Sequence, residues 1–308
     1  MITFGSRTAL ISLLLLASFG GSVATVHRLD RMGPHATLEE ALYVPSATVL
    51  KRLSLGYNAL LADVYWTRVV QYFGSKHMAN SMEYKLLYPL LDIATSLDPQ
   101  LVPAYDFGSV FLAQKPPQGA GAPHEAVALL DRGIQQNPKE WRLYQDLGFI
   151  YYIELHDYPA AGKAFHQGAE LPGAHPFMRV LAARSLQHGG EYQTSQLLWS
   201  SIYESSSDAT VRKSAVKHLR ALQVDQTVST LEQAVQLFKA QYGRLPSALS
   251  ELVTARLVTN LPRDPLGHPY QLRPDGGVQV QDYLELPYIT KGLPPGQMPS
   301  DFDLSSNP

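Results

Sequence analysis

Few residues of this chain have the types and spacings that catalysis requires. Ser214 and Lys217 match the spacing of a serine nucleophile activated by a lysine, and His124-Glu125 could begin a metal or acid–base site. Neither pair has a companion, because no second ligand follows His124 four residues on and Ser214 lies in a polar helical stretch without a further motif. The chain also lacks the His-Glu-x-x-His, phosphate-loop and Gly-x-Ser-x-Gly motifs. We therefore expect a protein that is not an enzyme and that uses no cofactor or metal.

Composition excludes several other classes of protein. The 308 residues carry a formal charge of −2, which gives no broad basic field for the phosphates of nucleic acid. With no cysteine, the chain has no disulfide, thiolate nucleophile, zinc–thiolate site or c-type haem attachment. Since 45% of the residues are hydrophobic and 17% charged, the chain can bury a sizeable core. A helical array with one small module fits this length better than a single compact domain.

An apolar run near the start predicts contact with a membrane. Residues 9–26 include no charged side chain, and Arg7 lies before them. Such a run suits a bilayer, so we expect residues 1–30 to be an anchor in the cytoplasmic membrane, with the bulk of the chain in the periplasm or outside. Ser22-Val23-Ala24 offers a small-x-small site for a signal peptidase, and a secreted or periplasmic chain is therefore the alternative. A buried core helix is a third interpretation.

Residues 37–83 predict a helical region ahead of the main array. Pro45 disfavours helix in the residue before it, Ser46 can cap a helix, and leucines follow at helical spacings. Five aromatic residues of this region surround Asp63 and Arg68 in the sequence: Tyr57, Tyr65, Trp66, Tyr72 and Phe73. They are either the apolar face of a long first helix that caps the array or a docking surface beside the membrane.

Residues 141–172 carry the pattern of two short helices packed against each other. Large and small apolar residues recur at helical spacings on each side of a turn at Asp157-Tyr158. They are Tyr144, Leu147, Gly148 and Tyr151 before the turn, and Ala161, Phe165 and Gly168 after it. The small residues let the helices approach while the rings fill the space between them, so a helical hairpin is predicted.

This spacing resembles the tetratricopeptide repeat, in which such positions recur at a period of about 34 residues. The stretch differs from the family in one extra residue before Asp157 and in Gly168, where the family prefers alanine. Residues 84–99 resemble the second helix of a repeat, and residues 101–138 a whole repeat with Phe107-Gly108 at the Leu-Gly positions and a loop at 115–123. A weaker repeat covers residues 175–206, and residues 209–222 look like a final helix. The resemblance implies a mostly α fold with a solenoid of helical hairpins over residues 84–222.

Stacked repeats of this family present a concave groove lined by the first helix of each pair. The groove positions of the family select ten residues of this chain: Tyr105, Ser109, Leu112, Arg142, Gln145, Phe149, Tyr152, Met178, Ala182 and Ser185. This mixed, aromatic and nearly uncharged lining suits an amphipathic helix or an extended apolar segment of a protein partner. The Lys and Asn clamp with which some members hold a C-terminal carboxylate is not present. Alternatively, Phe149 and Tyr152 only pack against an adjacent helix.

Beyond residue 224 the pattern changes to that of a small α+β module. An amphipathic helix ends at Tyr242-Gly243, and a second, short helix covers about residues 248–255. Residues 270–272 and 278–280 are candidate strands of a hairpin between proline- and glycine-rich turns.

This stretch resembles the globular part of the major pseudopilin of type II secretion. That family has a helix followed by a Gly-Arg-Tyr-Pro-like turn, here Gly243-Arg244-Leu245-Pro246, and later the motif Leu-Pro-x-Asp-Pro-Trp-Gly-x-Pro-Tyr. Five positions of the motif match, with Leu266 in place of the tryptophan: Asp264, Pro265, Gly267, Pro269 and Tyr270. The resemblance implies a pseudopilin-like module at residues 225–282. We expect residues 283–308, rich in Pro, Gly, Ser and Asp, to be an irregular tail.

Two features of the pseudopilin family are not carried over to this chain. The hydrophobic assembly helix of the family is not placed directly before the module, which argues against a filament subunit. The calcium site of the family is not expected either, because the residues after Val280 do not follow its pattern.

Two functions follow from these expectations. The first is a non-catalytic, membrane-tethered scaffold that binds a protein partner through the repeat groove, in assembly of the cell envelope, a secretion system or a pilus. The second is a structural component of a type II secretion or type IV pilus-like apparatus, which packs against pilin-like subunits through its pseudopilin-like module.

Overall fold

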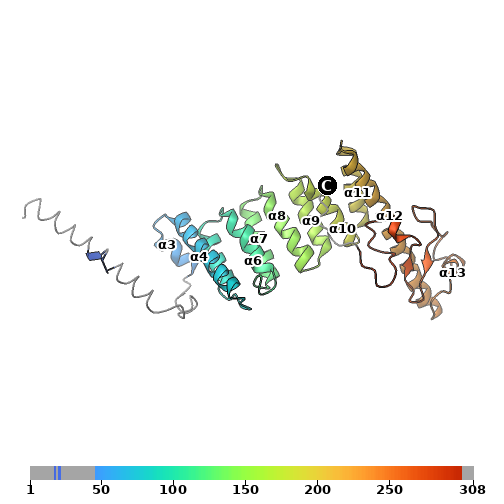
Figure 1. Cartoon of the computed structure of the whole chain (residues 1–308), viewed down its shortest axis with the longest axis horizontal. Coiled ribbons are helices and arrows are strands. Elements are labelled where there is room, and N and C mark those ends of the chain that lie inside the picture. The colour runs from blue at the N-terminus through green and yellow to red at the C-terminus, as the bar shows by residue number, and fades with distance from the viewer. Residues whose placement is uncertain (1–16, 19, 22–45, 300–308) are drawn as a thin grey trace, which may run out of the picture. The chain divides into compact units, whose positions relative to one another are not determined.

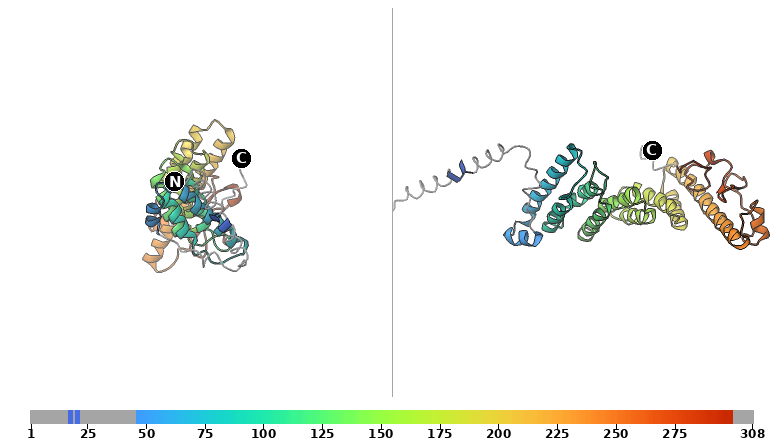
Figure 2. Two further views of the ribbon diagram at one scale, coloured as in Figure 1. Left: turned by 90° about the vertical axis from the view of Figure 1, so that its left-hand side faces the viewer. Right: turned by 90° about the horizontal axis from the view of Figure 1, so that it is seen from below.

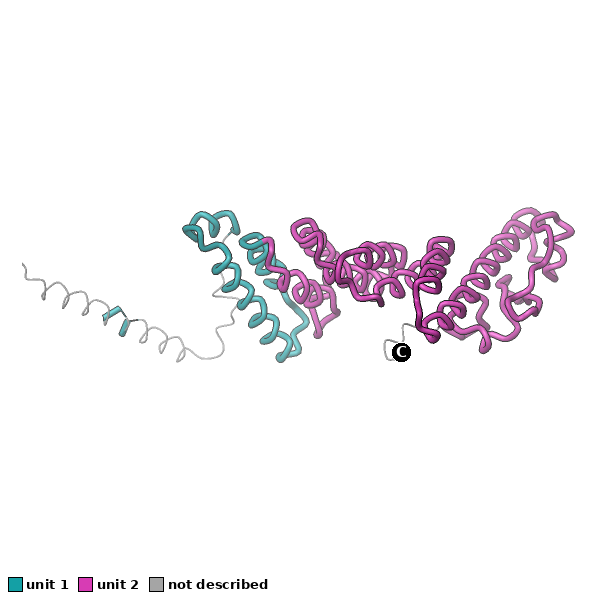
Figure 3. Tube along the Cα trace, turned by 90° about the horizontal axis from the view of Figure 1, so that it is seen from above, with its two compact units in different colours: residues 1–98 teal, residues 99–308 magenta. Residues whose placement is uncertain are grey.

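The computed structural model describes residues 17–18, 20–21 and 46–299 (Figure 1). These residues hold eleven α-helices, α3 to α13, a π-helical turn, a 3-10 helix and two short strands, so the expectation of a mostly α fold with a small strand pair is confirmed. Within this part of the chain, none of the helices combines the length and the apolarity that crossing a bilayer requires. Most of the expected anchor (1–16, 19 and 22–30) and residues 300–308 of the expected tail lie outside the described residues. The chain divides into two compact units, residues 1–98 and 99–308 (Figure 3).

The first unit holds three described helices, α3 (Ala47–Leu53), α4 (Asn58–Met78) and α5 (Leu87–Leu97). The expected cap is confirmed, because the Ser46 hydroxyl accepts a hydrogen bond from Val49 N at 3.4 Å. The leucine spacings predicted that the helix capped by Ser46 continues past residue 60, but the structure has two helices in its place. Leu55 and Gly56 adopt φ angles of 51° and 94°, in the left-handed region, which interrupts the helical path between α3 and α4.

The aromatic side chains of this unit divide between its core and its surface. Tyr65 and Tyr72 lie on the buried face of α4, and α4 packs against α5. The Tyr72 hydroxyl also accepts a hydrogen bond from Leu86 N at 3.3 Å. Tyr57, by contrast, is 70% exposed. Packing within the unit therefore accounts for Tyr65 and Tyr72 but not for Tyr57.

The second unit begins with helices that pack one against the next in chain order (Figure 1): α6 (Val102–Ala113), α7 (Pro123–Gln136), α8 (Trp141–Phe149), α9 (Tyr158–Ala169), α10 (Phe177–His188) and α11 (Tyr192–Ser205). Helices α6, α7 and α9 carry a proline in the first turn, where its missing N–H is not needed. The expected proline- and glycine-rich loop is confirmed, since residues 114–122 are irregular.

Glycines set how closely these helices approach. A Cβ atom added at Gly148 in α8 would lie 2.5 Å from the ring of Phe165 in α9, and one added at Gly133 in α7 would lie 2.8 Å from the ring of Tyr105 in α6. Cβ atoms of folded proteins essentially never come within 3.0 Å of such atoms. Both contacts therefore require glycine.

The helix that begins at Trp141 ends in a π-helical turn, η1 (Ile150–Glu154). A π turn holds one residue more than an α turn, because its hydrogen bonds join residues five apart. The bond from Leu155 N to Ile150 O, 3.2 Å long, has this spacing. The turn thus accommodates the extra residue before Asp157, whose carboxylate then caps α9 by accepting a hydrogen bond from Ala160 N at 3.0 Å.

One helix, α12 (Ala209–Tyr242), stands where the sequence pattern predicts two. The expectation of a separate final helix at residues 209–222 is wrong, and the expected change of domain at residues 222–225 falls inside α12. No proline or glycine interrupts this stretch, and Leu222 and Val224 are both buried. Gly243 ends the helix with a φ of 74°, as predicted.

The α+β module lies beside the C-terminal half of α12 (Figure 2). It consists of α13 (Ser250–Thr254) and an antiparallel hairpin of β1 (Gln271–Leu272) and β2 (Val278–Gln279). Gln271 pairs with Gln279 and Leu272 pairs with Val278, which confirms the predicted hairpin. The core of the module is apolar and includes Val228, Leu231, Val235, Phe238, Leu252, Tyr270, Val278 and Val280.

The expected irregular tail needs correction for residues 283–299, here called the C-terminal segment. Apart from the 3-10 helix η2 (Tyr283–Glu285), its described backbone is irregular, as its composition predicts. Leu286 and Ile289 nevertheless are only 3% exposed and belong to the core of the module. Val280 N also donates a hydrogen bond to Gly292 O at 3.0 Å. Tyr283, Tyr288 and Leu293 pack against the same core, so the apolar side chains of this proline- and glycine-rich segment make it part of the fold.

A buried carboxylate holds the C-terminal segment in place. Asp225 in α12 accepts hydrogen bonds from Thr290 N and Thr290 Oγ1, both at 2.8 Å, and from Lys291 N at 2.9 Å. Gln187 Nε2 of α10 donates to Asp225 at 2.8 Å and to Tyr288 O at 2.9 Å. Burial raises the pKa of Asp225 to about 6, and the hydrogen bonds oppose this rise. One carboxylate therefore joins α10, α12 and the C-terminal segment.

A stack of three rings supports the same junction. His218 of α12 lies between Trp199 of α11, at 3.9 Å and 6° between ring planes, and Tyr288 of the C-terminal segment, at 4.0 Å and 15°. Burial lowers the pKa of His218 to about 3. The imidazole is therefore neutral at physiological pH and packs as a flat ring.

Replacing Gly148 by alanine is expected to destabilise the protein, although alanine favours a helix interior by about 1 kcal/mol. The added Cβ would overlap the ring of the fully buried Phe165 at 2.5 Å, and overpacking costs up to about 3 kcal/mol, more than alanine gains. Chemical denaturation followed by circular dichroism should therefore give a lower free energy of unfolding. Gly74→Ala in α4 is the matched control, because no described atom beyond the local backbone of its own helix lies within 4 Å of the added Cβ, and it should be at least as stable as the wild type. Equal effects of the two substitutions would contradict the packing.

Asp225→Ala is expected to loosen the C-terminal segment. The substitution leaves the N–H groups of Thr290 and Lys291 without their acceptor, and each buried, unsatisfied donor costs about 1–3 kcal/mol. Amide hydrogen exchange should therefore become faster in residues 283–299. Thr290→Val, which removes only the hydroxyl bond, should cost about 1 kcal/mol and leave most of the protection. Unchanged exchange in Asp225→Ala would show that the carboxylate does not hold the segment.

Candidate functional site

The repeat expected at residues 101–138 aligns with the repeat at residues 141–172 one residue away from the alignment that the sequence predicts. Tyr105 packs against Gly133 in the α6–α7 pair, as Tyr144 packs against Gly168 in the α8–α9 pair. Tyr105 therefore corresponds to Tyr144, whereas the sequence pattern equated it with Gln145. A slip of one residue rotates the face of a helix by about 100°, which turns the expected groove residues of α6 towards the neighbouring helices.

The expected groove residues of α6 and α10 are accordingly buried. Tyr105, Ser109 and Leu112 of α6 are at most 2% exposed. Met178, Ala182 and Ser185 of α10 are at most 1% exposed, because α10 packs against both α9 and α11. The expectation that these six residues line an open groove is therefore wrong for this structure.

The other four expected residues form a stripe along α8 and η1, here called the α8 stripe: Arg142, Gln145, Phe149 and Tyr152. Their spacings of three, four and three residues place them on one side of a helix. Arg142 is exposed, and the other three are half-buried. The structure thus brings together a guanidinium, an amide and two rings within about three turns.

Contacts with neighbouring side chains hold the α8 stripe in place. Arg142 forms an ion pair of 3.3 Å with Glu140 and lies 5.0 Å from the centre of the Trp141 ring. Phe149 meets Phe165 of α9 edge to face, with 5.1 Å between ring centroids. Such contacts restrict the rotamers of both partners while leaving part of each stripe residue accessible.

Tyr152 belongs to a second group of rings. It contacts Tyr158 of α9 edge to face at 5.0 Å and His188 of α10 at 6.0 Å. Phe149 and Tyr152 therefore pack against adjacent helices with part of each ring, and the rest of each ring stays accessible.

An acidic pair lies beside the α8 stripe. Burial raises the pKa of Asp146 in α8 to about 9, and the negative charge of Asp106 in α6 adds to this rise, while Arg142 opposes it. Asp146 is therefore protonated at neutral pH and contributes no charge to the surface near Arg142. The sequence pattern did not select Asp146, because its position gives no sign of how deeply the helix contact buries it.

The pseudopilin-like turn is held by its own hydrogen bonds. Asp264 Oδ1 accepts bonds from Leu266 N at 2.9 Å and His268 N at 2.8 Å. Gly267 adopts a φ of 91° at the tip, a conformation that favours glycine. Tyr270 is only 7% exposed and packs in the core of the module.

The five matched motif positions thus differ in exposure. Asp264 and Tyr270 are buried, Pro265 is half-buried, and Gly267 and Pro269 are exposed. Only the tip of the turn can meet a partner.

A histidine and two carboxylates lie near this turn. His268 Nδ1 is 3.8 Å from Asp264 Oδ2 and 3.4 Å from Asp282 Oδ2. Among the described residues, no group of three His, Cys, Asp or Glu side chains is arranged to hold a metal ion. These groups can form ion pairs when the imidazole is protonated.

A pocket of about 870 Å³ lies beside α12 in the second unit. Its lining comes from one face of α12, the turn between β1 and β2, the start of α11 and the C-terminal segment: Gly190, Tyr192, Ser229, Glu232, Gln233, Gln236, Leu237, Arg273, Asp275, Gly276, Gly277 and Lys291. These side chains offer amides, hydroxyls and both signs of charge. The pocket is therefore suited to binding a polar chain by hydrogen bonds.

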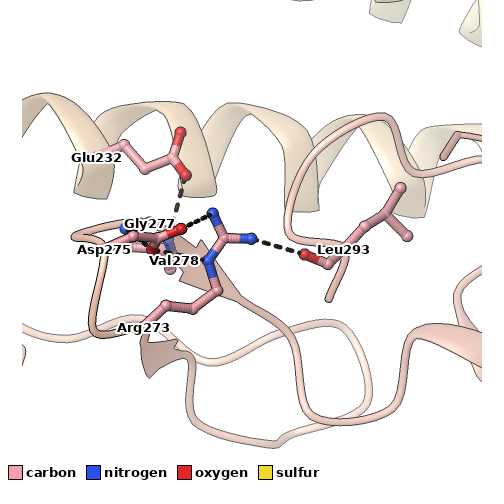
Figure 4. Close-up of polar contacts among 6 residues, drawn as sticks. All are labelled: Glu232, Arg273, Asp275, Gly277, Val278 and Leu293. Carbon is pink, nitrogen blue, oxygen red and sulfur yellow. Dashed lines mark hydrogen bonds and ion pairs between the residues drawn. The ribbon is translucent and has the colours of Figure 1, made fainter. Parts of the chain in front are cut away.

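Hydrogen bonds connect the wall of this pocket where the hairpin turn meets α12 (Figure 4). Arg273 bonds both oxygens of Asp275 at 3.0–3.1 Å and donates to Leu293 O at 3.1 Å. Glu232 accepts a hydrogen bond from Val278 N at 3.1 Å. The turn signal at residues 273–277 was visible in the sequence, but Glu232 is 46 residues from its partner and only the fold brings them together.

Replacing Asp146 by asparagine is expected to change how stability depends on pH. The folded chain holds a proton with a pKa of about 9, against an ordinary value of 3.8, so wild-type stability falls as pH rises between these values. Asparagine resembles the protonated carboxyl group and does not ionise. The gain in unfolding free energy of the variant should therefore grow from pH 5 to pH 8, by at most about 1.4 kcal/mol per pH unit.

Denaturation curves at several pH values would measure this effect. Asp106→Asn removes the second cause of the shift, and it should weaken the pH dependence without abolishing it. A parallel loss of stability in wild type and Asp146→Asn as pH rises would contradict the assignment.

Comparison with known proteins gives no family for this chain. No family model, curated protein or solved structure matches it. The function proposed for it therefore depends on the geometry of its own residues.

Proposed function

We propose that this protein is a non-catalytic, membrane-tethered scaffold that binds a polypeptide partner through the α8 stripe. The observation that carries the proposal is the partial exposure of Arg142, Gln145, Phe149 and Tyr152 on one side of a helix. Their backbones are fixed by the contact of Gly148 with Phe165. A fixed row of this kind binds a partner at little cost in conformational entropy.

The chemistry of the α8 stripe suits a helix or an extended segment with apolar side chains. The half-buried edges of Phe149 and Tyr152 can contact apolar groups, and Gln145 can bond the backbone or polar side chains of the partner. Arg142 adds a preference for a carboxylate at one end. Because Asp146 is protonated at neutral pH, it does not repel such a carboxylate.

Two structural details support the resemblance to tetratricopeptide repeats. The π turn η1 accounts for the extra residue by which residues 141–172 differ from the family spacing. The small residues Gly148 and Gly168 lie against Phe165 and Tyr144, as the pattern positions require. We therefore propose that the helix pairs from α6 to α11 are repeats of this kind.

Membrane tethering is proposed from residues 9–26, whose apolar and uncharged sequence suits a bilayer. The bulk of the chain then lies on the outer side of the cytoplasmic membrane, in the cell envelope. A partner of this scaffold would belong to envelope, secretion or pilus assembly.

A second candidate function is favoured by the pocket beside α12. The pocket lies in the part of the chain that resembles the major pseudopilin, and Leu237 at its edge is 59% exposed. A structural component of a secretion or pilus-like apparatus could receive a segment of a pilin-like subunit there.

Site-specific photo-crosslinking in cells tests both functions. A crosslinking amino acid at Gln145 should give a defined polypeptide adduct if the α8 stripe binds the partner, and one at Leu237 should do so if the pocket is the contact. Gln167, an exposed residue of α9, provides the control position. Arg142→Ala and Tyr152→Ala should each lower the yield at position 145 about fivefold or more, as truncation of interface anchors does.

The substituted chains must keep the helical circular dichroism of the wild type for this comparison. Adducts of equal yield at positions 145 and 167 would contradict binding by the α8 stripe. A defined adduct at position 237 alone would favour the second function.

A further inference from the structure

The junction of α3 and α4 exposes an unusual amount of apolar surface. Six large apolar side chains within residues 49–64 are between 44% and 86% exposed, and we call them the α3–α4 tip: Val49, Leu53, Leu55, Tyr57, Leu60 and Val64. Leu55, in the connection between the helices, is the most exposed of them at 86%. So many exposed apolar side chains this close together in the sequence indicate a contact surface.

Packing within the first unit does not account for the tip. The buried face of α4 is made by residues such as Ala62, Tyr65 and Val69, whereas Tyr57, Leu60 and Val64 follow one another at spacings of three and four residues on the opposite side. The first half of α4 is therefore apolar on two sides. Only one of them meets α5 and the rest of the described unit.

Basic residues accompany the apolar ones. Lys51 and Arg52 are exposed in the last turn of α3, and Arg68 is exposed in α4. Asp63 is the one acid within residues 46–70, so this stretch carries three basic and one acidic side chain, whereas the whole chain carries a net charge of −2. Exposed apolar and aromatic side chains flanked by basic residues are the composition of a protein surface that enters the headgroup layer of an anionic bilayer.

The position of the tip in the chain favours the same partner. Residues 27–45 separate it from the apolar run at residues 9–26. Nineteen residues span at most about 65 Å, so a chain anchored by that run keeps the tip within reach of the bilayer. Tethering of this kind makes even a weak contact effective, because it raises the local concentration of the lipid surface.

We propose that the α3–α4 tip is a membrane-surface contact that inserts its apolar side chains into the headgroup layer of an anionic bilayer. The proposal rests on the tether of the proposed function and adds a second point of contact. It orients the first unit at the membrane, because Leu55 and Tyr57 enter the bilayer while Lys51 and Arg52 meet the lipid phosphates.

The chain has no cysteine, so single cysteines can report on the depth of chosen sites. Leu55→Cys in the full chain, labelled with an environment-sensitive fluorophore, is reconstituted in vesicles of phosphatidylcholine with phosphatidylglycerol. We expect a blue-shifted emission and quenching by nitroxide-labelled lipid. Met78→Cys is the matched control, because Met78 is also 86% exposed but lies at the far end of α4, a helix about 30 Å long. The label at position 78 should stay accessible to aqueous iodide.

Charge and apolar surface can be removed separately. Lys51→Gln with Arg52→Gln should lower the ratio of inserted to free tip about 25-fold, since each basic residue strengthens binding to an anionic surface about fivefold. Leu53→Ser with Leu60→Ser should lower it in neutral and anionic vesicles alike. Both pairs are exposed, so the fold of the unit should remain.

Several outcomes would overturn the proposal. A label at position 55 that stays open to iodide in anionic vesicles means that the tip does not insert. A label shielded from iodide but not quenched by nitroxide lipid means that protein, either this chain or a second copy, covers the tip.

Flotation of the vesicles separates this proposal from the tether. If the chain floats with the vesicles and the label at position 55 remains aqueous, only the tip contact is wrong. If the chain does not float at all, both the tether and the tip contact are wrong.

Discussion

The contact of an aromatic ring with a glycine on the facing helix is the constraint on which the helical part of this protein depends. The ring of Phe165 packs against Gly148, and the ring of Tyr105 packs against Gly133, so closely that neither glycine has room for a Cβ atom. These contacts fix how the two helices of a pair are rotated about their axes. Rotation in turn decides which residues of the first helix face outward, and it leaves Arg142 and Gln145 at the surface while Tyr105 is buried. The proposed partner surface is therefore a consequence of the same packing that holds the pair together.

A second constraint joins the helix pairs to the α+β module. The helix α12 has no interruption between Ala209 and Tyr242. Its first half packs against α11 and its second half against the α+β module, so it connects the two directly. The Asp225 carboxylate adds a polar link, since it accepts bonds from Gln187 of α10 and from Thr290 and Lys291 of the C-terminal segment. A buried carboxylate is stable only when such donors surround it. The module, α12 and the C-terminal segment thus share one core in the second unit.

Predictions from the sequence were most accurate where local chemistry decides the structure. The cap at Ser46, the helix end at Gly243, the loop at 114–122 and the β-hairpin all follow from residues within a few positions of one another. They were less accurate where burial decides. A one-residue slip in the register of α6 changed the exposure of Tyr105, and the many prolines and glycines of residues 283–299 concealed the packing of Leu286 and Ile289.

The sequence by itself determined that the chain is mostly helical, where most of its helices and turns lie, and that its charge and composition give it no basic field and no cysteine chemistry. Tertiary structure alone decided the continuity of α12, the raised pKa of Asp146, the pocket between Glu232 and Arg273 and the exposed tip between α3 and α4. The physical reason is the range of the interactions. Capping and turn formation act between neighbours in the chain, whereas burial, desolvation of charge and the approach of distant side chains depend on what the whole fold places around each residue.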